Sequence, residues 1–369
     1  MTDSISRRSF IKAAAVVGAG AGFSVLGFSL AGCSSDDKSP TTDDTAATDN
    51  QKTEELFPIR MVSLSIFNEF VVGEELGFFA DEGIEIVYTG STPQGVTEFQ
   101  LIEQGELDMF CNTHPPSLAQ ARIAGLDMVS VQPGTRDTSE YPHVQYLVLE
   151  DSDIQSIEDF RGKKVGISGL VACTNGFIDY YLGQKLSDYS PDDIEYVTLA
   201  NTVEPSLLSG QIDVATSHNP AAGVTLAAGG VRRVATSSDI LQQEDFSLGV
   251  RGFSQKFIDE HPDIVQGFAN ACYRSRLWIE NNREEAIKIN AAYLNVDPAT
   301  VSPAAYELNK NHVRADLERW LTIGEAIGNW EPGQITVDEI YTNEFVPVDP
   351  PASDADIRWD GTVDESTGV

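Results

Sequence analysis

The run Arg161-Gly162-Lys163-Lys164-Val165-Gly166-Ile167-Ser168-Gly169, which continues into Leu170-Val171-Ala172-Cys173-Thr174-Asn175-Gly176-Phe177, decides the fold of this 369-residue chain. Residues 165–168 are typical of a short buried strand, and the residues from Cys173 onward are typical of a helix start. A strand that ends in a small-residue turn and opens a helix directs unpaired backbone N–H groups at the space above the sheet. Ligands of open α/β sheets bind outside the carboxyl ends of the strands, so the stretch predicts one edge of a binding site. A structural turn without a ligand is the alternative, and the repetition of such turns along the chain favours the site.

Strand and helix alternate twice, from residue 59 to about 131 and again from about 145 to 235, with an irregular polar stretch at 132–146. This alternation predicts an α/β fold of two lobes, each a mainly parallel sheet with flanking helices. Helices over 69–80 and 303–312 are among those expected, and the helices after residue 254 are expected to pack on lobe 1. We expect the hinge where the chain crosses between the lobes, near 145–149 and 247–250.

The N-terminus predicts export and lipidation. Arg7 and Arg8 precede a Gly/Ala-rich apolar run from residue 13 to 32, which resembles a twin-arginine export signal. The run ends at Leu30-Ala31-Gly32-Cys33, which is similar to a lipobox whose Cys33 becomes the lipidated first residue. An uncleaved transmembrane anchor is the alternative, but the repeated Gly and Ala make the run weakly hydrophobic for a spanning helix.

The predicted division of the chain follows from these patterns. It is 1–32 for the signal peptide, 33–55 for a flexible tether, 56–146 with 250–347 for lobe 1, 147–249 for lobe 2 and 348–369 for a disordered tail.

Charge and cysteine content narrow the function classes. The chain carries 57 acidic and 24 basic residues, a formal net charge of −33, which would repel nucleic acid and anionic lipid. A saline habitat is one explanation for such an acidic surface. Beyond Cys33 there are Cys111, Cys173 and Cys272, which allow at most one disulfide and leave an odd thiol.

Four segments carry a resemblance to a known family. They are Glu74-Glu75-Leu76-Gly77-Phe78-Phe79-Ala80-Asp81-Glu82-Gly83-Ile84, Ile157-Glu158-Asp159-Phe160-Arg161-Gly162-Lys163-Lys164-Val165-Gly166, Gly210-Gln211-Ile212-Asp213-Val214 and Phe257-Ile258-Asp259-Glu260-His261-Pro262. Residues 57–347 resemble the solute-binding proteins of ABC importers for sulfonate, nitrate and taurine, together with their thiamine-precursor-binding relatives. The resemblance implies a two-lobed type 2 periplasmic-binding-protein fold with a ligand held between the lobes.

Mapping the family's ligand loops onto this chain implies a set of site residues at strand ends. They are Ser65, Phe67, Asn68, Ser91, Thr92, Asn112, Thr113, His114, Ser168, Cys173, Thr174, Asn175, His218 and Asn219. At each position a capping or turn role is the alternative, since Ser, Thr and Asn favour those places. Sulfonate- and nitrate-type relatives often show an aromatic-acidic pair where this chain has His218-Asn219, so the substrate is left open.

The chemistry of these positions suits a small solute. None carries a formal charge, which favours a neutral ligand, or a small anion held by helix N-termini and hydroxyl groups. Phe67 and Tyr141 would pack against a ring, so a small organic anion or a heteroaromatic compound is expected. His114 and His218 are predicted to face each other across the cleft, which predicts an affinity that changes between about pH 5 and 8. Cys111 and Cys173 suggest a metal site with these histidines, but their spacing matches no compact zinc pattern, and no metal or other cofactor is predicted.

The resemblance and the export signal together imply a lipid-anchored, monomeric solute-binding protein that delivers its solute to an ABC permease outside the cytoplasmic membrane. It is expected not to be an enzyme. The alternatives are an enzyme of pyrimidine or menaquinone-precursor synthesis on the same fold, and a ligand-sensing lipoprotein without transport.

Overall fold

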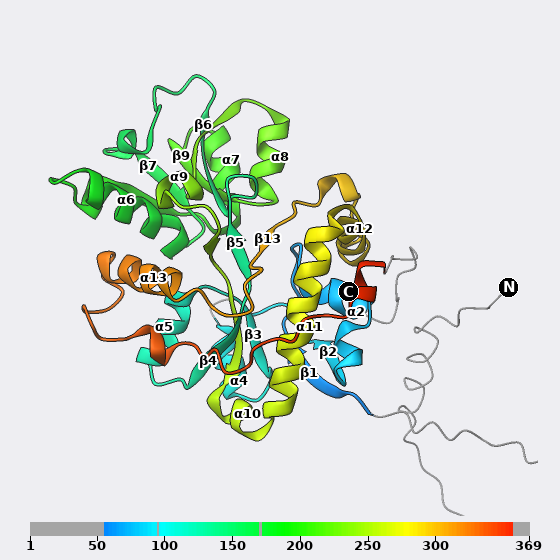
Figure 1. Ribbon diagram of the computed structural model, residues 1–369. Helices are drawn as coiled ribbons and strands as arrows, with labels where there is room; N and C mark the ends of the chain where they lie inside the picture. Colours follow the sequence, from blue (N-terminus) through cyan, green and yellow to red (C-terminus); the bar gives the residue numbers. More distant parts are fainter. Residues whose placement is uncertain (1–54, 94–95, 170–171, 357–369) are drawn as a thin grey trace, which may run out of the picture. The chain divides into compact units, whose positions relative to one another are not determined.

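The structure is a computed structural model that describes residues 55–93, 96–169 and 172–356 (Figure 1). Arg7, Arg8, Cys33, the predicted tether and the end of the predicted tail lie outside the described residues. Within the described ranges, no helix combines the length and the apolar character that a membrane crossing requires.

Lobe 1 contains two small sheets. In the first, β1 (Phe57–Met61) and β2 (Ile84–Tyr88) pair in parallel. In the second, the order is β3-β12-β4, and β12 runs antiparallel to both neighbours. The bounds are Met109–Thr113 for β3, Met128–Pro133 for β4 and Val250–Ser254 for β12. Because β12 is the strand that returns from lobe 2, it enters the sheet in the opposite direction to β3 and β4.

Four helices of lobe 1 connect these strands: α2 (Glu69–Glu75), α3 (Phe78–Asp81), α4 (Glu98–Glu103) and α5 (Pro115–Ile123). The single helix expected over 69–80 is wrong, because Gly77 adopts φ 76° and separates α2 from α3. A left-handed residue cannot continue an α-helix, and glycine adopts this conformation at little cost.

Lobe 2 is built on one mixed five-stranded sheet of order β10-β6-β9-β7-β8. β7 is parallel to β8 and β9, whereas β6 runs antiparallel to both β9 and β10. The bounds are Val144–Leu149 for β6, Lys164–Ile167 for β7, Glu195–Thr198 for β8, Val214–His218 for β9 and Val231–Thr236 for β10. The run 161–177 therefore contains strand β7, which lies between β9 and β8, and the turn η2 (Ala172–Gly176) that follows it.

Helical segments flank this sheet. They are the 3-10 turns η1 (Ile157–Phe160), η3 (Pro191–Asp193) and η4 (Ala200–Thr202), the π-helical turn η2 (Ala172–Gly176), and the α-helices α6 (Phe177–Lys185), α7 (Val203–Leu208), α8 (Ala221–Ala228) and α9 (Ser237–Leu241).

A third small sheet marks where the chain passes between the two lobes. Its order is β11-β5-β13, from β5 (Thr135–Asp137), β11 (Phe246–Ser247) and β13 (Ala305–Tyr306), and Figure 1 shows β5 and β13 between the two groups of elements. The first crossing thus precedes residues 145–149, which lie within strand β6 of lobe 2. The helix expected over 303–312 is also wrong, because residues 305 and 306 pair with the free edge of β5 instead.

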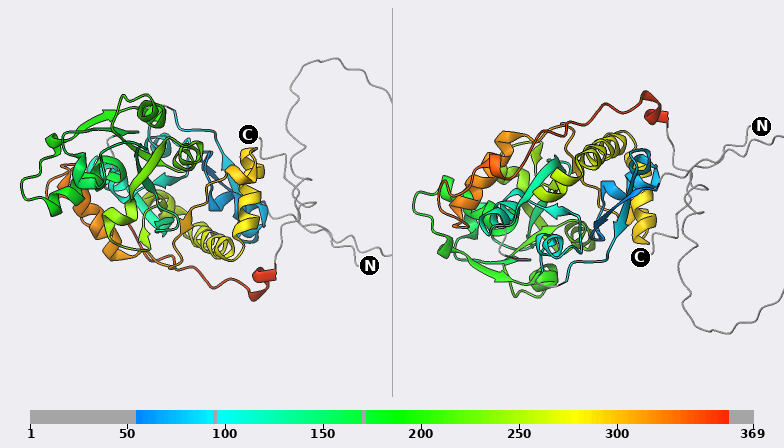
Figure 2. Two further views of the ribbon diagram at one scale, coloured as in Figure 1. Left: turned by 90° about the horizontal axis from the view of Figure 1, so that it is seen from above. Right: turned by 90° about the horizontal axis from the view of Figure 1, so that it is seen from below.

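The C-terminal part is mostly helical. It contains α10 (Gln255–Glu260), α11 (Pro262–Asn281), α12 (Arg283–Leu294), α13 (Arg314–Ala326), and the 3-10 turns η5 (Pro298–Thr300), η6 (Val337–Glu339) and η7 (Ala352–Asp356). Helices α11 and α12 pack on α2 of lobe 1, as both views of Figure 2 show beside the blue strands.

Helix α13 joins the two hydrophobic cores. Its Leu317 and Leu321 belong to the core of lobe 1, whereas Trp320 and Ile323 belong to the core of lobe 2. The spacing of three and four residues places the two pairs on neighbouring faces of one helix. As a result, α13 contacts α5 of lobe 1 as well as η2 and α6 of lobe 2.

Candidate functional site

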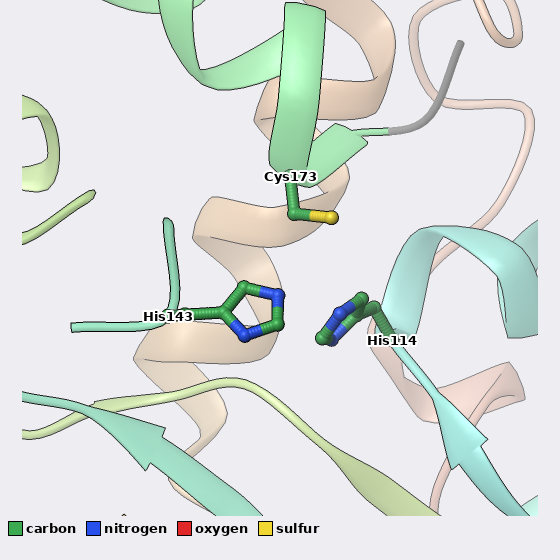
Figure 3. Close-up of side chains that lie close together, drawn as sticks. All are labelled: His114, His143 and Cys173. Atoms are coloured by element: carbon green, nitrogen blue, oxygen red, sulfur yellow. The ribbon is translucent and has the colours of Figure 1, made fainter. Parts of the chain in front are cut away.

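Three histidines and a cysteine meet between the two lobes. Figure 3 shows two of the histidines, His114 and His143, together with Cys173. His114 follows β3 and precedes Pro115, the first residue of α5. His218 is the last residue of β9, and His143 directly precedes β6, where Val144 pairs with His218. Cys173 lies in the π-helical turn η2 after β7. Each side chain therefore stands at the end of a sheet strand or in the turn beside it, which is where α/β sheets bind ligands.

The four side chains are close enough to act together. The ligand-type atoms of His114, His143 and Cys173 all lie within 4.8 Å of one another. The Cys173 sulfur lies 3.8 Å from Nε2 of His218. The ring centroid of His143 is 4.8 Å from that of His114 and 4.8 Å from that of His218, both edge to face. His143 is thus the central ring of the three.

Burial keeps these four groups uncharged near neutral pH. Burial lowers the pKa of His218 to about 4, with a smaller contribution from His114. Burial also lowers the pKa of His143 well below its ordinary value, and it lowers that of His114 against the opposing hydrogen bond to Leu248. The same desolvation raises the pKa of the Cys173 thiol to about 12. Protonation of His218 therefore belongs below the pH 5–8 window that an unperturbed imidazole predicts.

Trp320 of α13 fixes the position of His114. Its indole is fully buried, stacks on the His114 ring at 5.4 Å and on the Phe177 ring at 5.1 Å, and donates from Nε1 to the Ser247 carbonyl at 2.8 Å. Nδ1 of His114 lies 3.0 Å from the Leu248 carbonyl, which selects the tautomer with hydrogen on Nδ1. Segments from both lobes and from α13 thereby hold one imidazole.

Several residues predicted to bind ligand also make contacts within the protein, and their ligand role stays a prediction. Asn68 caps α2 by accepting from the Val71 amide at 3.0 Å, and Phe67 is buried against Tyr306. Thr174 donates from its hydroxyl to the Gly169 carbonyl at 2.7 Å, inside the turn. Asn175 is buried and bonds to Asp179 through Nδ2, while its Oδ1 has no hydrogen-bond partner among the described residues.

The remaining predicted residues lie at strand ends with varied exposure. Ser65, Ser91 and Ser168 are exposed, whereas Thr92, Thr113 and Asn219 are half-buried. Asn112 is in β3, and its side chain lies outside the described part of the structure. Asn219 accepts from Nε2 of Gln145 at 3.1 Å, which ties the end of β9 to β6. Their roles in ligand binding stay predictions.

The sequence analysis missed His143 and Trp320. His143 lies in the stretch expected to be irregular. Its place beside His218 follows from the antiparallel pairing of β6 with β9, which the sequence does not predict. Trp320 is one of many aromatic residues in the C-terminal helices and resembles ordinary core there.

Cys111 is not part of this cluster: its thiol donates to Glu98 at 3.6 Å within the core of lobe 1. The three described cysteines are all free and buried.

A surface pocket lies elsewhere, at the C-terminal end of α5. It is lined by Arg122, Ile123, Asp127, Gln334, Ile335 and Glu339, among others, and the guanidinium of Arg122 pairs with Asp127. It includes none of the residues predicted to bind ligand.

The chain is similar in sequence to proteins whose names refer to different small molecules. It is 30% identical over 146 residues to a Haemophilus influenzae protein provisionally named for thiamine biosynthesis, an alignment of 39% of this chain and 43% of that protein. It is 22% identical to the riboflavin-binding protein RibY of Chloroflexus aurantiacus, over 76% of this chain and 82% of that protein. A provisionally named aliphatic sulfonates-binding protein of Escherichia coli is 26% identical over 57% of this chain and 62% of that protein. The match thus spans less than half of the Haemophilus relative.

Solved structures confirm the type 2 periplasmic-binding-protein fold. The periplasmic aliphatic sulphonate binding protein SsuA of Escherichia coli superposes with a TM-score of 0.60 at 16% identity, over 80% of this chain and 94% of that one. The desulfurization enzyme DSZB has the same fold, with a TM-score of 0.57 at 17% identity over 78% of this chain and 97% of that one. The fold therefore occurs in both binding proteins and an enzyme.

Family models account for the N-terminus and for the lobes. A twin-arginine translocation signal matches residues 4–24, which confirms the predicted export; lipidation of Cys33 stays a prediction. The model described as NMT1/THI5 like matches residues 66–286, more than half of the 369 residues. The chain belongs to the NMT1/THI5-like family.

Proposed function

We propose that this protein is the extracytoplasmic solute-binding component of an ABC importer, held at the outer face of the cytoplasmic membrane through Cys33. The export signal, the family and the two-lobed fold support this proposal. The curated relatives bear names that refer to riboflavin, sulfonates and thiamine, so they support the role of a binder more than any one solute.

The observation that carries the proposal is the convergence of imidazole and thiol groups from both lobes at the strand ends, with the Trp320 indole of α13 packed against His114. Trp320 holds the His114 ring in place, and the amide of Asn175 leaves Oδ1 as an acceptor without a partner among the described residues. Burial holds the histidines neutral, so they bring no cation to pair with an anionic solute. We therefore favour an uncharged heteroaromatic solute, with a small organic anion bound by N–H groups as the second choice.

Binding would proceed by hinge motion of the lobes. The segments β5 and β11 lie in connections that cross between the hydrophobic cores, and they pair with each other through Asp137 and Phe246. A solute that contacts His114 on one lobe and His218 on the other gains both sets of contacts only when the lobes are closed. Differential contact of this kind shifts the population toward the closed state, which the permease would recognise.

An enzyme is the second candidate, because Cys173 and His218 form a thiol–imidazole pair and DSZB shares the fold. A nucleophilic cysteine needs a low thiol pKa or an imidazole that takes its proton. Burial here raises the pKa of Cys173 to about 12 and lowers that of His218 to about 4, so the proton stays on sulfur. This electrostatic arrangement argues against covalent catalysis and for a binding role.

The test is a thermal-shift screen of the whole chain against pyrimidines, thiamine precursors, riboflavin, small sulfonates, carboxylates and nitrate. A solute at a hundred times its dissociation constant should add about 2.7 kcal/mol to the free energy of unfolding. We expect a hit among the heteroaromatic compounds that is weakened in His114→Ala and in His218→Ala.

The matched control is His261→Ala, because that imidazole stacks on Phe57 and Phe257 in lobe 1, away from the cluster. A hit that the site variants and the control weaken equally would remove the assigned site. Turnover of any bound compound by the wild type but not by Cys173→Ser would favour the enzyme instead.

A further inference from the structure

The cluster between the lobes consists of four side chains that are common ligands of transition metals. Three imidazoles and one thiol come from four separate segments: the end of β3, the residue before β6, the turn η2 and the end of β9. Figure 3 shows the ring edge of His143 facing both the His114 ring and the Cys173 sulfur. No short spacing motif links these residues, because the fold rather than the local sequence brings them together.

The hydrogen bonds around His114 leave one nitrogen free to bind a metal. Its Nδ1–H donates to the Leu248 carbonyl at 3.0 Å, so Nε2 carries the lone pair. Metal-binding histidines usually make this kind of bond through the other ring nitrogen, which fixes the tautomer and the ring orientation. The stack on Trp320 restrains the ring further.

His143 is held by its backbone and has an unsatisfied ring nitrogen. Its backbone amide donates to the buried carboxylate of Asp137 at 2.6 Å, and the Ser238 hydroxyl donates to the other oxygen of that carboxylate at 2.7 Å. Its Nε2 is shielded from solvent and has no hydrogen-bond partner among the described residues. Buried polar atoms nearly always have a partner, so a nitrogen of this kind points to a ligand that the polypeptide does not supply.

We propose that His114, His143, His218 and Cys173 together bind one Zn²⁺ ion in a tetrahedral site between the lobes. Bonds of about 2.0 Å to nitrogen and 2.3 Å to sulfur place tetrahedral ligand atoms roughly 3.3–3.5 Å apart. The Cys173 sulfur lies 3.8 Å from Nε2 of His218, and the ligand-type atoms of His114, His143 and Cys173 all lie within 4.8 Å of one another. Binding of the ion would require side-chain rotations that shorten these separations.

The choice of metal follows from the ligands. Neutral imidazoles and a thiolate suit Zn²⁺ and related first-row ions, whereas Ca²⁺ and Mg²⁺ require oxygen ligands. On binding, the S–H bond of Cys173 breaks, sulfur bonds to the ion, and the proton passes to solvent, so charge and atoms balance. The proposal goes beyond solute binding but shares His114 and His218 with it, so the ion and a solute would compete for these imidazoles.

Cobalt titration of the whole chain, after removal of metals with a chelator, tests the site. Co²⁺ substitutes for Zn²⁺ and reports tetrahedral geometry through intense d–d bands and a bound thiolate through a charge-transfer band. We expect one equivalent to bind, both kinds of band to appear, and stoichiometric Zn²⁺ to abolish them. Absence of these bands with the folded protein would overturn the proposal.

Variants assign the ligands. Cys173→Ser should lose the charge-transfer band, and His143→Ala should weaken cobalt binding by roughly 100-fold or more, since even the loss of a second-shell partner costs about 10–100-fold. Cys272→Ser is the matched control: this cysteine is buried in the core of lobe 1, and its substitution should leave the spectrum unchanged. A charge-transfer band that persists in Cys173→Ser would refute the assignment.

X-ray absorption of the zinc-loaded wild type covers the case in which a variant fails to fold. The expected shell is one sulfur at about 2.3 Å and three nitrogens at about 2.0 Å. A shell of oxygens only would refute the site. The solute screen is run on metal-free protein, so the two experiments give separate results. A solute hit without cobalt bands would overturn the zinc site alone. Cobalt bands without a solute hit would leave the zinc site supported and count against the proposed solutes.

Discussion

Two regions of this molecule enclose imidazole rings, and they differ in the hydrogen-bond partners that they provide for the ring nitrogens. His312 lies in lobe 1, where Nε2 is 2.7 Å from the Ser130 hydroxyl and Nδ1 is 3.1 Å from Oδ1 of Asn343. In the cluster between the lobes, His143 has an unpartnered Nε2, and His218 contacts only a thiol and another imidazole among the bonds and ring contacts of the described residues. Burial alone therefore does not distinguish a structural histidine from a binding one.

What distinguishes the two regions is the supply of hydrogen-bond partners. A buried ring nitrogen without a hydrogen-bond partner lowers the stability of the fold. Such a nitrogen is expected where a bound ligand supplies the missing partner. At His312 the protein provides both partners, and the ring serves to join the β4 strand to the C-terminal segment. At the cluster the protein provides ring positions and leaves the nitrogens available, which is the arrangement that a solute or a metal ion requires.

The largest effect is expected from Trp320, which holds the cluster but does not touch His312. Trp320→Ala removes a fully buried indole between His114 and Phe177 and should cost about 3–5 kcal/mol of unfolding free energy, measured by urea denaturation. Trp320→Phe keeps most of the packing but leaves the Ser247 carbonyl unpaired, so it should cost less. Equal losses in the two variants would contradict the packing role of the indole.

The pH dependence of stability should be the next largest effect. Burial lowers the pKa of His312 to about 4, whereas an imidazole in the unfolded chain titrates near its ordinary value of 6.5. Between these values the unfolded chain binds a proton that the folded chain excludes, so stability is full above pH 6.5 and falls as the pH falls toward 4. One such group contributes roughly 3 kcal/mol over this window.

Urea denaturation at pH 7, 6 and 5 measures this loss. His312→Gln should reduce the slope between pH 6 and 5 by roughly 1.4 kcal/mol per pH unit, whatever its stability at pH 7. His218, whose pKa is also about 4, should behave in the same way when it is replaced by Gln. An unchanged slope in both variants would show that these rings are charged in the folded state.

A direct comparison of two substitutions at pH 7 sharpens the contrast. His312→Ala removes a buried ring together with its bonds to the Ser130 hydroxyl and to Oδ1 of Asn343, and should cost about 2–4 kcal/mol. His143→Ala removes a ring whose Nε2 already lacks a partner, and should cost about 1–2 kcal/mol in metal-free protein without solute. If His143→Ala proved the more destabilising of the two, the imidazole cluster would be a structural element rather than a binding site.

Much of the fold could be predicted from the sequence because its signals are local. Gly162 and the strand residues that follow it mark β7, and the segment beginning at Glu74 marks the entry to β2. The direction of β6 and β12 could not be predicted, because it depends on which strands they meet after the chain crosses between the lobes. For the same reason residues 305 and 306 form a strand: pairing with β5 overrides the helical tendency that Pro303 suggests.

The candidate cluster contains residues that the sequence predicts and residues that it does not. His114, Cys173 and His218 are predicted from the family resemblance, and each lies at or just after the end of a recognisable strand. His143 was missed, since its place is set by an antiparallel partner that is distant in the sequence. Ser, Thr and Asn at strand ends gave an ambiguous signal, because the same residues cap helices and close turns.

Substitution of Asn68 is expected to change stability least, and it tests directly whether a polar residue at a strand end caps a helix or binds ligand. The resemblance implies a ligand contact, whereas the structure shows a buried cap whose Oδ1 accepts from the Val71 amide and whose backbone N–H donates to Asn290 at 2.8 Å. Loss of the cap in Asn68→Ala should cost about 1 kcal/mol of unfolding free energy, and Asn68→Asp, which can still accept, should cost less. Neither substitution should change the affinity for a solute found in the screen, measured by calorimetry, because a cap acts on the helix rather than on the ligand. A tenfold or greater loss of affinity in Asn68→Ala with stability unchanged would restore Asn68 to the binding site, and would show that polar groups of the β1–α2 loop bind ligand together with the histidines.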